Sequence, residues 1–98
     1  MAAPYRVVYS EATRAKLKRS VQRASDKGYG HESLASLKAI DAALRADPIG
    51  FGDPWFDLPE KSQRVMNRSF PPWMVVYGVH SKEPVVFVRT IELLEGEE

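Results

Sequence analysis

The C-terminal third of the chain constrains the fold most, because it contains three consecutive strand-like segments separated by turn-forming residues. We expect these strands over residues 63–70, 73–80 and 84–91. All three are rich in β-branched and aromatic residues, which favour strands. Pro71-Pro72 and the run from His80 to Pro84 break the pattern between them. Short connections of this kind predict strands that turn back on one another in an antiparallel sheet.

The residues before this region predict one short strand followed by two helices. Tyr5–Tyr9 is strand-like, and Ser10 is a suitable N-cap for a helix over residues 11–27. A second helix is expected over residues 32–46, ending before Pro48. Helical spacing and strand alternation predict a set of buried residues. These are Leu17, Val21, Leu37, Ile40, Leu44, Val76 and Val88.

Residues 48–59 are rich in Gly and Pro and are predicted to form a loop whose aromatic residues pack on the body of the protein. The resulting order is β-α-α-β-β-β. This order predicts an α+β fold with two helices packed on one antiparallel sheet. The length of 98 residues, with no linker or repeat, indicates a single domain over residues 1–98.

Composition excludes several classes of function. The chain has no cysteine, so we expect neither disulfides nor a thiolate metal site. No apolar run resembles a signal peptide or a membrane span, so we expect no membrane partner. Residues 1–30 carry seven Lys or Arg against two acids, a balance of +5, while four glutamates lie from Glu92 onward. A basic helix of this kind faces solvent, nucleic acid or an acidic protein.

The order and spacing of several landmarks resemble the RelE/ParE superfamily of bacterial toxins from type II toxin–antitoxin systems. The resemblance covers nearly the whole chain. The landmarks are Tyr5–Ser10 before a helix, Leu44–Pro48 leading into Gly50 and Gly52, Val75–Val79, and Val85–Val88.

The resemblance implies a small cytoplasmic toxin without a cofactor, which inhibits growth or stabilises a plasmid and is neutralised by a cognate antitoxin. Two activities occur in the superfamily. RelE-like members cut mRNA in the ribosomal A site without a metal, whereas ParE-like members inhibit DNA gyrase. Fold alone does not choose between them, because function resides in the site.

Two departures from the RelE-like pattern affect the chemistry of RNA cleavage, which needs cations for the phosphate and an acid–base pair. Ribosome-dependent members have an arginine two residues before the strand's Val-Tyr pair, where this chain has Met74 or a residue close to it. They also have basic and Tyr or His residues after the last strand. Here that segment, Glu92–Glu98, is acidic and would repel a phosphate.

Other residues could supply a site. Arg64 and Arg68 lie four residues apart on one predicted strand, hence on one face, and Arg89 lies on the last strand. If these arginines converge on the open sheet face, they could bind a phosphate, an antitoxin or a target. The alternative is that Arg64 and Arg68 face solvent and that Arg89 pairs with Glu92 or Asp57. Alternation predicts Val86 and Val88 on one face and Phe87 and Arg89 on the other.

His80 is a candidate general acid or base, or an idle residue in a turn. Trp73, with Trp55 and Phe56, could form an aromatic lid that binds a partner, or could belong to the core. We interpret the chain as a toxin that binds a protein target such as gyrase. Two alternatives stay open: a metal-free mRNA endoribonuclease that uses Arg64, Arg68 and Arg89, and a non-toxic interaction module. Oligomeric state is not predicted.

Overall fold

The computed structural model describes residues 4–94 of the chain. Two long helices and five strands account for most of these residues. None of the helices within residues 4–94 is long and apolar enough to cross a membrane. The elements in chain order are β1 (Arg6–Tyr9), α1 (Glu11–Asp26), α2 (Gly30–Ala46), α3 (Pro48–Phe51), β2 (Asp53–Leu58), η1 (Pro59–Lys61), β3 (Gln63–Phe70), β4 (Trp73–His80) and β5 (Val85–Leu93).

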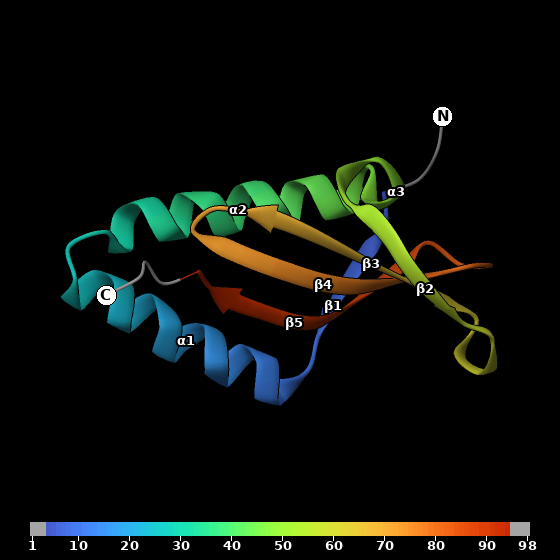
Figure 1. Cartoon of the computed structure of the whole chain (residues 1–98), viewed down its shortest axis with the longest axis horizontal. Coiled ribbons are helices and arrows are strands. Elements are labelled where there is room, and N and C mark those ends of the chain that lie inside the picture. The colour runs from blue at the N-terminus through green and yellow to red at the C-terminus, as the bar shows by residue number, and fades with distance from the viewer. Residues whose placement is uncertain (1–3, 95–98) are drawn as a thin grey trace.

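The five strands form one sheet in the order β1-β5-β4-β3-β2. The β2, β3, β4 and β5 strands pair as antiparallel neighbours, and β1 pairs with β5 in parallel. The α1–α2 hairpin turns at one end of the molecule, and η1 projects at the other (Figure 1). The predicted α+β class and the three C-terminal strands are confirmed. The parallel β1–β5 pair makes the sheet mixed, because the chain crosses over through α1 and α2 before the sheet resumes.

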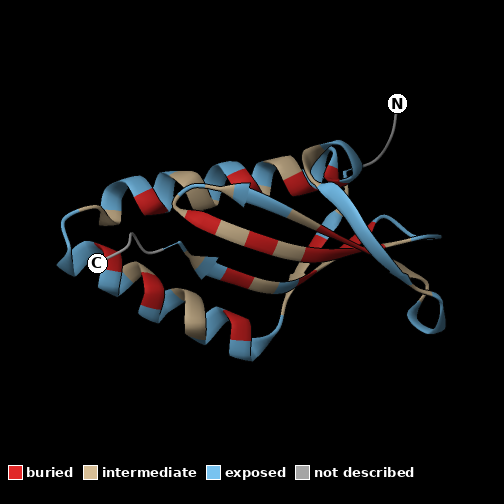
Figure 2. Ribbon diagram, in the orientation of Figure 1, coloured by how far each residue is buried: buried red, intermediate tan, exposed pale blue. Residues whose placement is uncertain are grey.

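One face of the sheet packs against the helices and forms the core. On β4, the residues Trp73, Val75, Tyr77 and Val79 are all buried on this face. The indole Nε1 of Trp73 donates a hydrogen bond to the Ser33 carbonyl in α2 at 3.0 Å. The Tyr77 hydroxyl donates to the Pro48 carbonyl in α3 at 2.6 Å. Buried and half-buried residues therefore alternate along the first part of β4 (Figure 2), as a strand with one covered face requires. Gly78, which follows Tyr77, is buried as well.

The helix ends follow from local sequence. The Ser10 side chain accepts a hydrogen bond from the Thr13 N–H at 3.0 Å, which caps α1 as predicted. Gly28 follows α1 with a φ of +93°, a conformation that glycine adopts without steric cost. The α2 helix begins at Gly30, two residues before the predicted start, and ends at Ala46 before Pro48.

The prediction of a loop over residues 48–59 is wrong, because the structure places α3, β2 and the start of η1 there. The Asp47 side chain accepts a hydrogen bond from the Gly50 N–H at 3.0 Å and so caps α3. β2 is the edge strand of the sheet, and a bulge interrupts its register at Trp55. An edge strand tolerates Pro54 because one side of its backbone needs no partner, so tertiary pairing overrides the local turn preference.

Burial of Ile40, Leu44 and Val88 is confirmed. Burial of Leu17, Val21, Leu37 and Val76 was predicted wrongly, since all four are only half-buried. Helical and strand periodicity identifies an apolar face, but it does not show whether another element covers that face. These partly exposed apolar residues therefore mark surfaces that the fold leaves open.

Candidate functional site

The structure places Arg64 and Arg68 on one face of β3, as predicted, but this is the helix-facing side of the sheet. Their cross-strand partners on β4 are Val79 and Val75, which point to the core face. The Arg64 Nε donates to the Asp57 carboxylate at 2.9 Å. Arg64 and Arg68 therefore do not lie on the open face of the sheet, although both are exposed to solvent.

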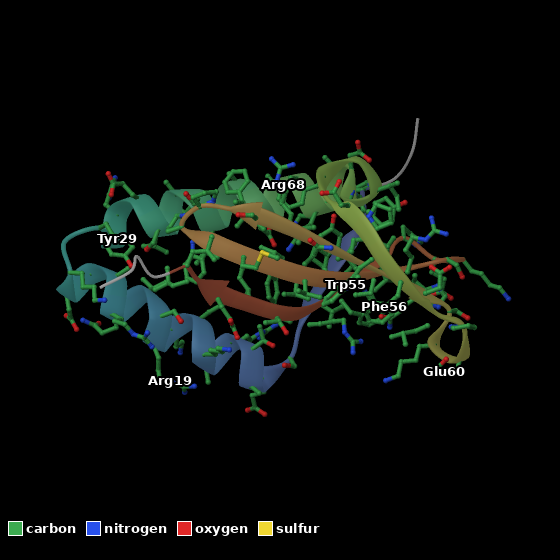
Figure 3. The ribbon with its side chains drawn as sticks, viewed as in Figure 1. Arg19, Tyr29, Trp55, Phe56, Glu60 and Arg68 are labelled. Carbon is green, nitrogen blue, oxygen red and sulfur yellow. The ribbon has the colours of Figure 1, made fainter. Side chains whose placement is uncertain are left out.

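Arg68 is held by α3 and two aromatic rings. Its Nη1 donates to the Phe51 carbonyl at 2.7 Å. Its guanidinium carbon lies 5.0 Å from the centre of the Phe51 ring and 5.8 Å from that of Phe70. Figure 3 shows Arg68 beside the C-terminal end of α2, away from Trp55 and Phe56. This arrangement orients the guanidinium for a structural role at the β3–α3 contact.

Arg89 is exposed on β5, and the structure does not bring it together with the other two arginines. It is the extra residue of a bulge, because Val76 pairs with Thr90 and Tyr77 with Val88. The bulge interrupts the predicted alternation at Arg89, although Val86 and Val88 do share the core face. β4 lies between β3 and β5, so the backbones of these strands are about 10 Å apart.

The partners expected for Arg89 are engaged elsewhere. Glu92 accepts a hydrogen bond from the Lys16 ammonium at 2.8 Å, which joins β5 to α1. Asp57 pairs with Arg64. The predicted segment after the last strand lies partly outside the described residues, from residue 95 onward.

His80 lies at the end of β4 and stabilises the turn that follows. Its Nδ1 accepts hydrogen bonds from the backbone N–H groups of Lys82 and Glu83, both at 3.1 Å. A neutral imidazole with an accepting Nδ1 carries its proton on Nε2. His80 therefore presents a hydrogen-bond donor to its surroundings while the turn is intact, which suits binding better than proton abstraction.

The aromatic lid does not form. Trp73 is completely buried beneath α2, so its side chain reaches no partner in the folded protein. Trp55 and Phe56 are 62% and 43% exposed on the edge strand, and their rings meet edge to face with centroids 5.2 Å apart. Among residues 4–94, no three His, Asp or Glu side chains are grouped closely enough to hold a metal ion.

A wide apolar hollow lies between α1 and α2, and sequence reasoning missed it. We call it the hairpin groove. Two adjoining hollows of about 580 and 490 Å³ share Leu17, Lys18, Leu34 and Leu37, and Val21 continues the floor of the smaller one. Leu34 is 45% exposed. The signal in the sequence is the pair of apolar helix faces, which helical spacing alone assigns to the core.

The rim of the hairpin groove is basic. Arg14 and Lys18 from α1 face Lys38 and Arg45 from α2 across the larger hollow. Arg45 is paired with Asp41, whose second carboxylate oxygen accepts a hydrogen bond from the Tyr9 hydroxyl at 2.6 Å. An apolar floor between two basic walls fits an amphipathic segment with acidic edges.

The Tyr9–Asp41–Arg45 network fixes the end of the groove where β1 meets α2. Burial alone would raise the pKa of Asp41, but hydrogen bonds from Arg45 and Tyr9 outweigh it and hold the pKa below its usual value. Burial and the same carboxylate raise the pKa of Tyr9. Asp41 is therefore charged and Tyr9 neutral near pH 7, so Asp41 offsets part of the positive charge of Arg45.

No protein-family model matches the chain, and no curated protein matches its sequence. Among solved structures, the chain resembles one chain of the toxin–antitoxin complex RelBE2 from Mycobacterium tuberculosis, with a TM-score of 0.59 and 15% sequence identity. The alignment covers 93% of this chain and 99% of that one. The chain therefore has the RelE-type toxin fold that its landmarks predicted.

Proposed function

We propose that this chain is the toxin of a type II toxin–antitoxin system, that an acidic amphipathic segment of its antitoxin binds the hairpin groove, and that the toxin acts by binding a protein target. The fold supports the first part, since the similar chain comes from a toxin–antitoxin complex. The hairpin groove carries the second part. It combines an exposed leucine with four basic side chains on facing helices.

The dispersed arginines favour protein binding over RNA cleavage. An RNase of this size needs cations directed at one phosphate, together with an acid and a base. Arg64 is neutralised by Asp57, Arg68 is held by α3, and Arg89 lies two strands away. We therefore assign the chain to the ParE-like mode of action, with DNA gyrase as the proposed target and the cytoplasm as its place of action.

Controlled expression in bacteria without the neighbouring gene tests this proposal. We expect growth arrest with intact transcripts and altered DNA supercoiling. The triple variant Arg64→Ala, Arg68→Ala, Arg89→Ala should still arrest growth, provided that circular dichroism shows it folded. Transcript cleavage that this variant loses would instead establish the endoribonuclease alternative.

A matched control is Arg19→Ala, which removes one charge from the outer side of α1 (Figure 3). It should behave as the unmodified chain in every assay. Normal growth in the presence of soluble, folded protein would contradict the toxin assignment and favour a non-toxic interaction module.

A further inference from the structure

The open face of the sheet carries an apolar row that the sites described so far do not use. On the opposite face, α2 and α3 accept hydrogen bonds from Trp73 and Tyr77. Strand register aligns one residue from each of the five strands on the open face, and we call this set the open-face row. Its members, in order from β2 to β1, are Phe56, Val65, Gly78, Phe87 and Val8. The row therefore crosses the sheet from one edge to the other.

The open-face row has exposed aromatic residues at its β2 end and a gap in its middle. Phe56 is 43% exposed, and the bulge in β2 brings Trp55 beside it, with ring centroids 5.2 Å apart. Gly78 has no side chain, so the row is interrupted between Val65 and Phe87. A gap flanked by apolar side chains is suited to an apolar side chain from a partner.

The side-chain amide of Gln63 covers this gap. A Cβ atom at Gly78 would overlap the Gln63 Oε1, so the amide occupies the space of the missing side chain. This oxygen is buried and makes no hydrogen bond to any part of the chain between residues 4 and 94. Buried polar atoms of folded proteins almost always have a partner, and one without a partner is destabilising. The cover is therefore easily displaced, because moving the amide outward gives its oxygen a hydrogen bond.

The charges of the open face favour an uncharged partner. The charged residues that the register places on this face or in the β5 bulge are Arg6, Asp53, Arg89 and Glu92. Positive and negative charges balance in this set, and Glu92 is already paired with Lys16. Nucleic acid binds through several cations directed at its phosphates, and the open-face row itself contains none. A protein segment with apolar side chains fits the row better.

We propose that the open-face row binds an uncharged, extended segment of the toxin's protein target. One apolar side chain of that segment displaces the Gln63 amide and enters the gap above Gly78, while neighbouring side chains contact Phe56 and Phe87. This inference rests on the proposed function, because it takes the target to be a protein. It assigns target binding to a face of the sheet and antitoxin binding to the helices.

The affinity of the full chain for purified DNA gyrase, measured by biolayer interferometry, tests the role of the gap. Gln63→Ala removes the cover and should raise affinity about threefold, because no buried amide has to be displaced. Gly78→Ala fills the gap and should lower affinity about tenfold. Circular dichroism establishes that both variants are folded. Changes of affinity in the same direction would overturn the proposal.

A second pair of variants tests the aromatic end of the row. Phe56→Ser should lower the affinity for gyrase, because it removes an exposed ring from the row. Ile49→Ser is the matched control, since Ile49 is 51% exposed but lies on α3, away from the open face. It should bind as the unmodified chain does. Equal affinities of the two variants would overturn the docking surface and leave gyrase as the proposed target.

Nuclear magnetic resonance titration with capped pentapeptides tests the surface without gyrase. The uncharged peptide Thr-Val-Leu-Val-Thr should shift the backbone amide signals of Val65 and Phe87, and the same peptide with Glu in place of Leu should not. No shift with either peptide, or a shift with oligouridine instead, would overturn the proposal. If the uncharged peptide binds as expected but gyrase does not bind the chain, the docking surface stands and gyrase is the wrong target.

Discussion

At the residue scale, Gly52, which joins α3 to β2, shows how closely the chain approaches the core before β2 begins. A Cβ atom at this position would lie 2.6 Å from the Tyr77 hydroxyl oxygen and 2.7 Å from the Asn67 carbonyl oxygen. The Gly52 φ of −124° suits any residue, so the constraint is steric. Gly52→Ala should therefore lower the free energy of unfolding by about 1–3 kcal/mol through overpacking. Urea denaturation measures this loss.

Tyr77→Phe provides the control for that substitution. The Tyr77 hydroxyl of the unmodified chain donates a hydrogen bond to the Pro48 carbonyl. Burial raises the pKa of Tyr77 to about 12, so this hydroxyl is neutral near pH 7. Removing the hydroxyl relieves one of the two contacts. The double variant should then lose less stability than the sum of the single losses. If the two losses of stability simply add, the contact with the Tyr77 hydroxyl does not cause the loss seen in Gly52→Ala.

Asp41 is a second position where one residue determines a measurable property. Hydrogen bonds from Arg45 and Tyr9 outweigh burial and lower its folded-state pKa relative to the unfolded value of 3.8. Its contribution to stability is thus present above pH 3.8 and is lost as the pH falls through the folded-state pKa. We expect the stability difference between the unmodified chain and Asp41→Asn to shrink over that acid range. Urea unfolding at pH 7, 5, 4 and 3 tests this. A difference that stays constant with pH would contradict it.

At the element scale, the α1 N-terminus depends on a single cap. The Ser10 Oγ accepts the Thr13 N–H, and no other side chain of the described residues caps this helix end. Ser10→Ala should destabilise the fold by about 1 kcal/mol, and Ser10→Asp should retain most of that stability. Thermal unfolding followed by circular dichroism compares the two. Equal losses for both variants would exclude capping as the cause.

The elements also show what sequence could predict. Both long helices and the three C-terminal strands follow from local periodicity, caps and turn residues, and these define the fold class. β2 does not, because its residues acquire strand conformation only by pairing with β3. The hairpin groove was harder to predict from the sequence for the same reason. Sequence showed that Leu17 and Leu37 are apolar, but only their arrangement on two helices shows that they line a groove.

At the scale of the whole molecule, the hairpin groove is separate from the edge strand of the sheet. The groove lies between α1 and α2, whereas Trp55 and Phe56 lie on β2, the last strand of the sheet. Figure 3 shows these two side chains near the η1 end of the molecule, far from the turn that joins the long helices. A partner in the groove would therefore leave the sheet edge accessible.

On the proposed function, this separation predicts variants that lose antitoxin binding and keep toxicity. Lys18→Glu with Lys38→Glu reverses the charge of two facing rim residues of the groove. Affinity for the proposed antitoxin should fall at least tenfold, because like charges would face each other across the interface. Co-expressed antitoxin should then fail to restore growth, although the variant alone still arrests it. For the unmodified chain, affinity should also fall as salt concentration rises.

Arg19→Glu makes a comparable change in charge on α1 but outside the lining of the groove. Binding measured by calorimetry at two salt concentrations should therefore separate a local effect from one of net charge. Arg19→Glu reverses one charge and the double variant reverses two. If the loss of affinity for each reversed charge is the same in both variants, the antitoxin responds to the basic helix as a whole. The other outcome is that only the rim variant loses affinity and that its affinity depends less on salt than that of the unmodified chain. The antitoxin's acidic residues then contact the groove directly, because a charge pair that has been removed can no longer be screened by salt.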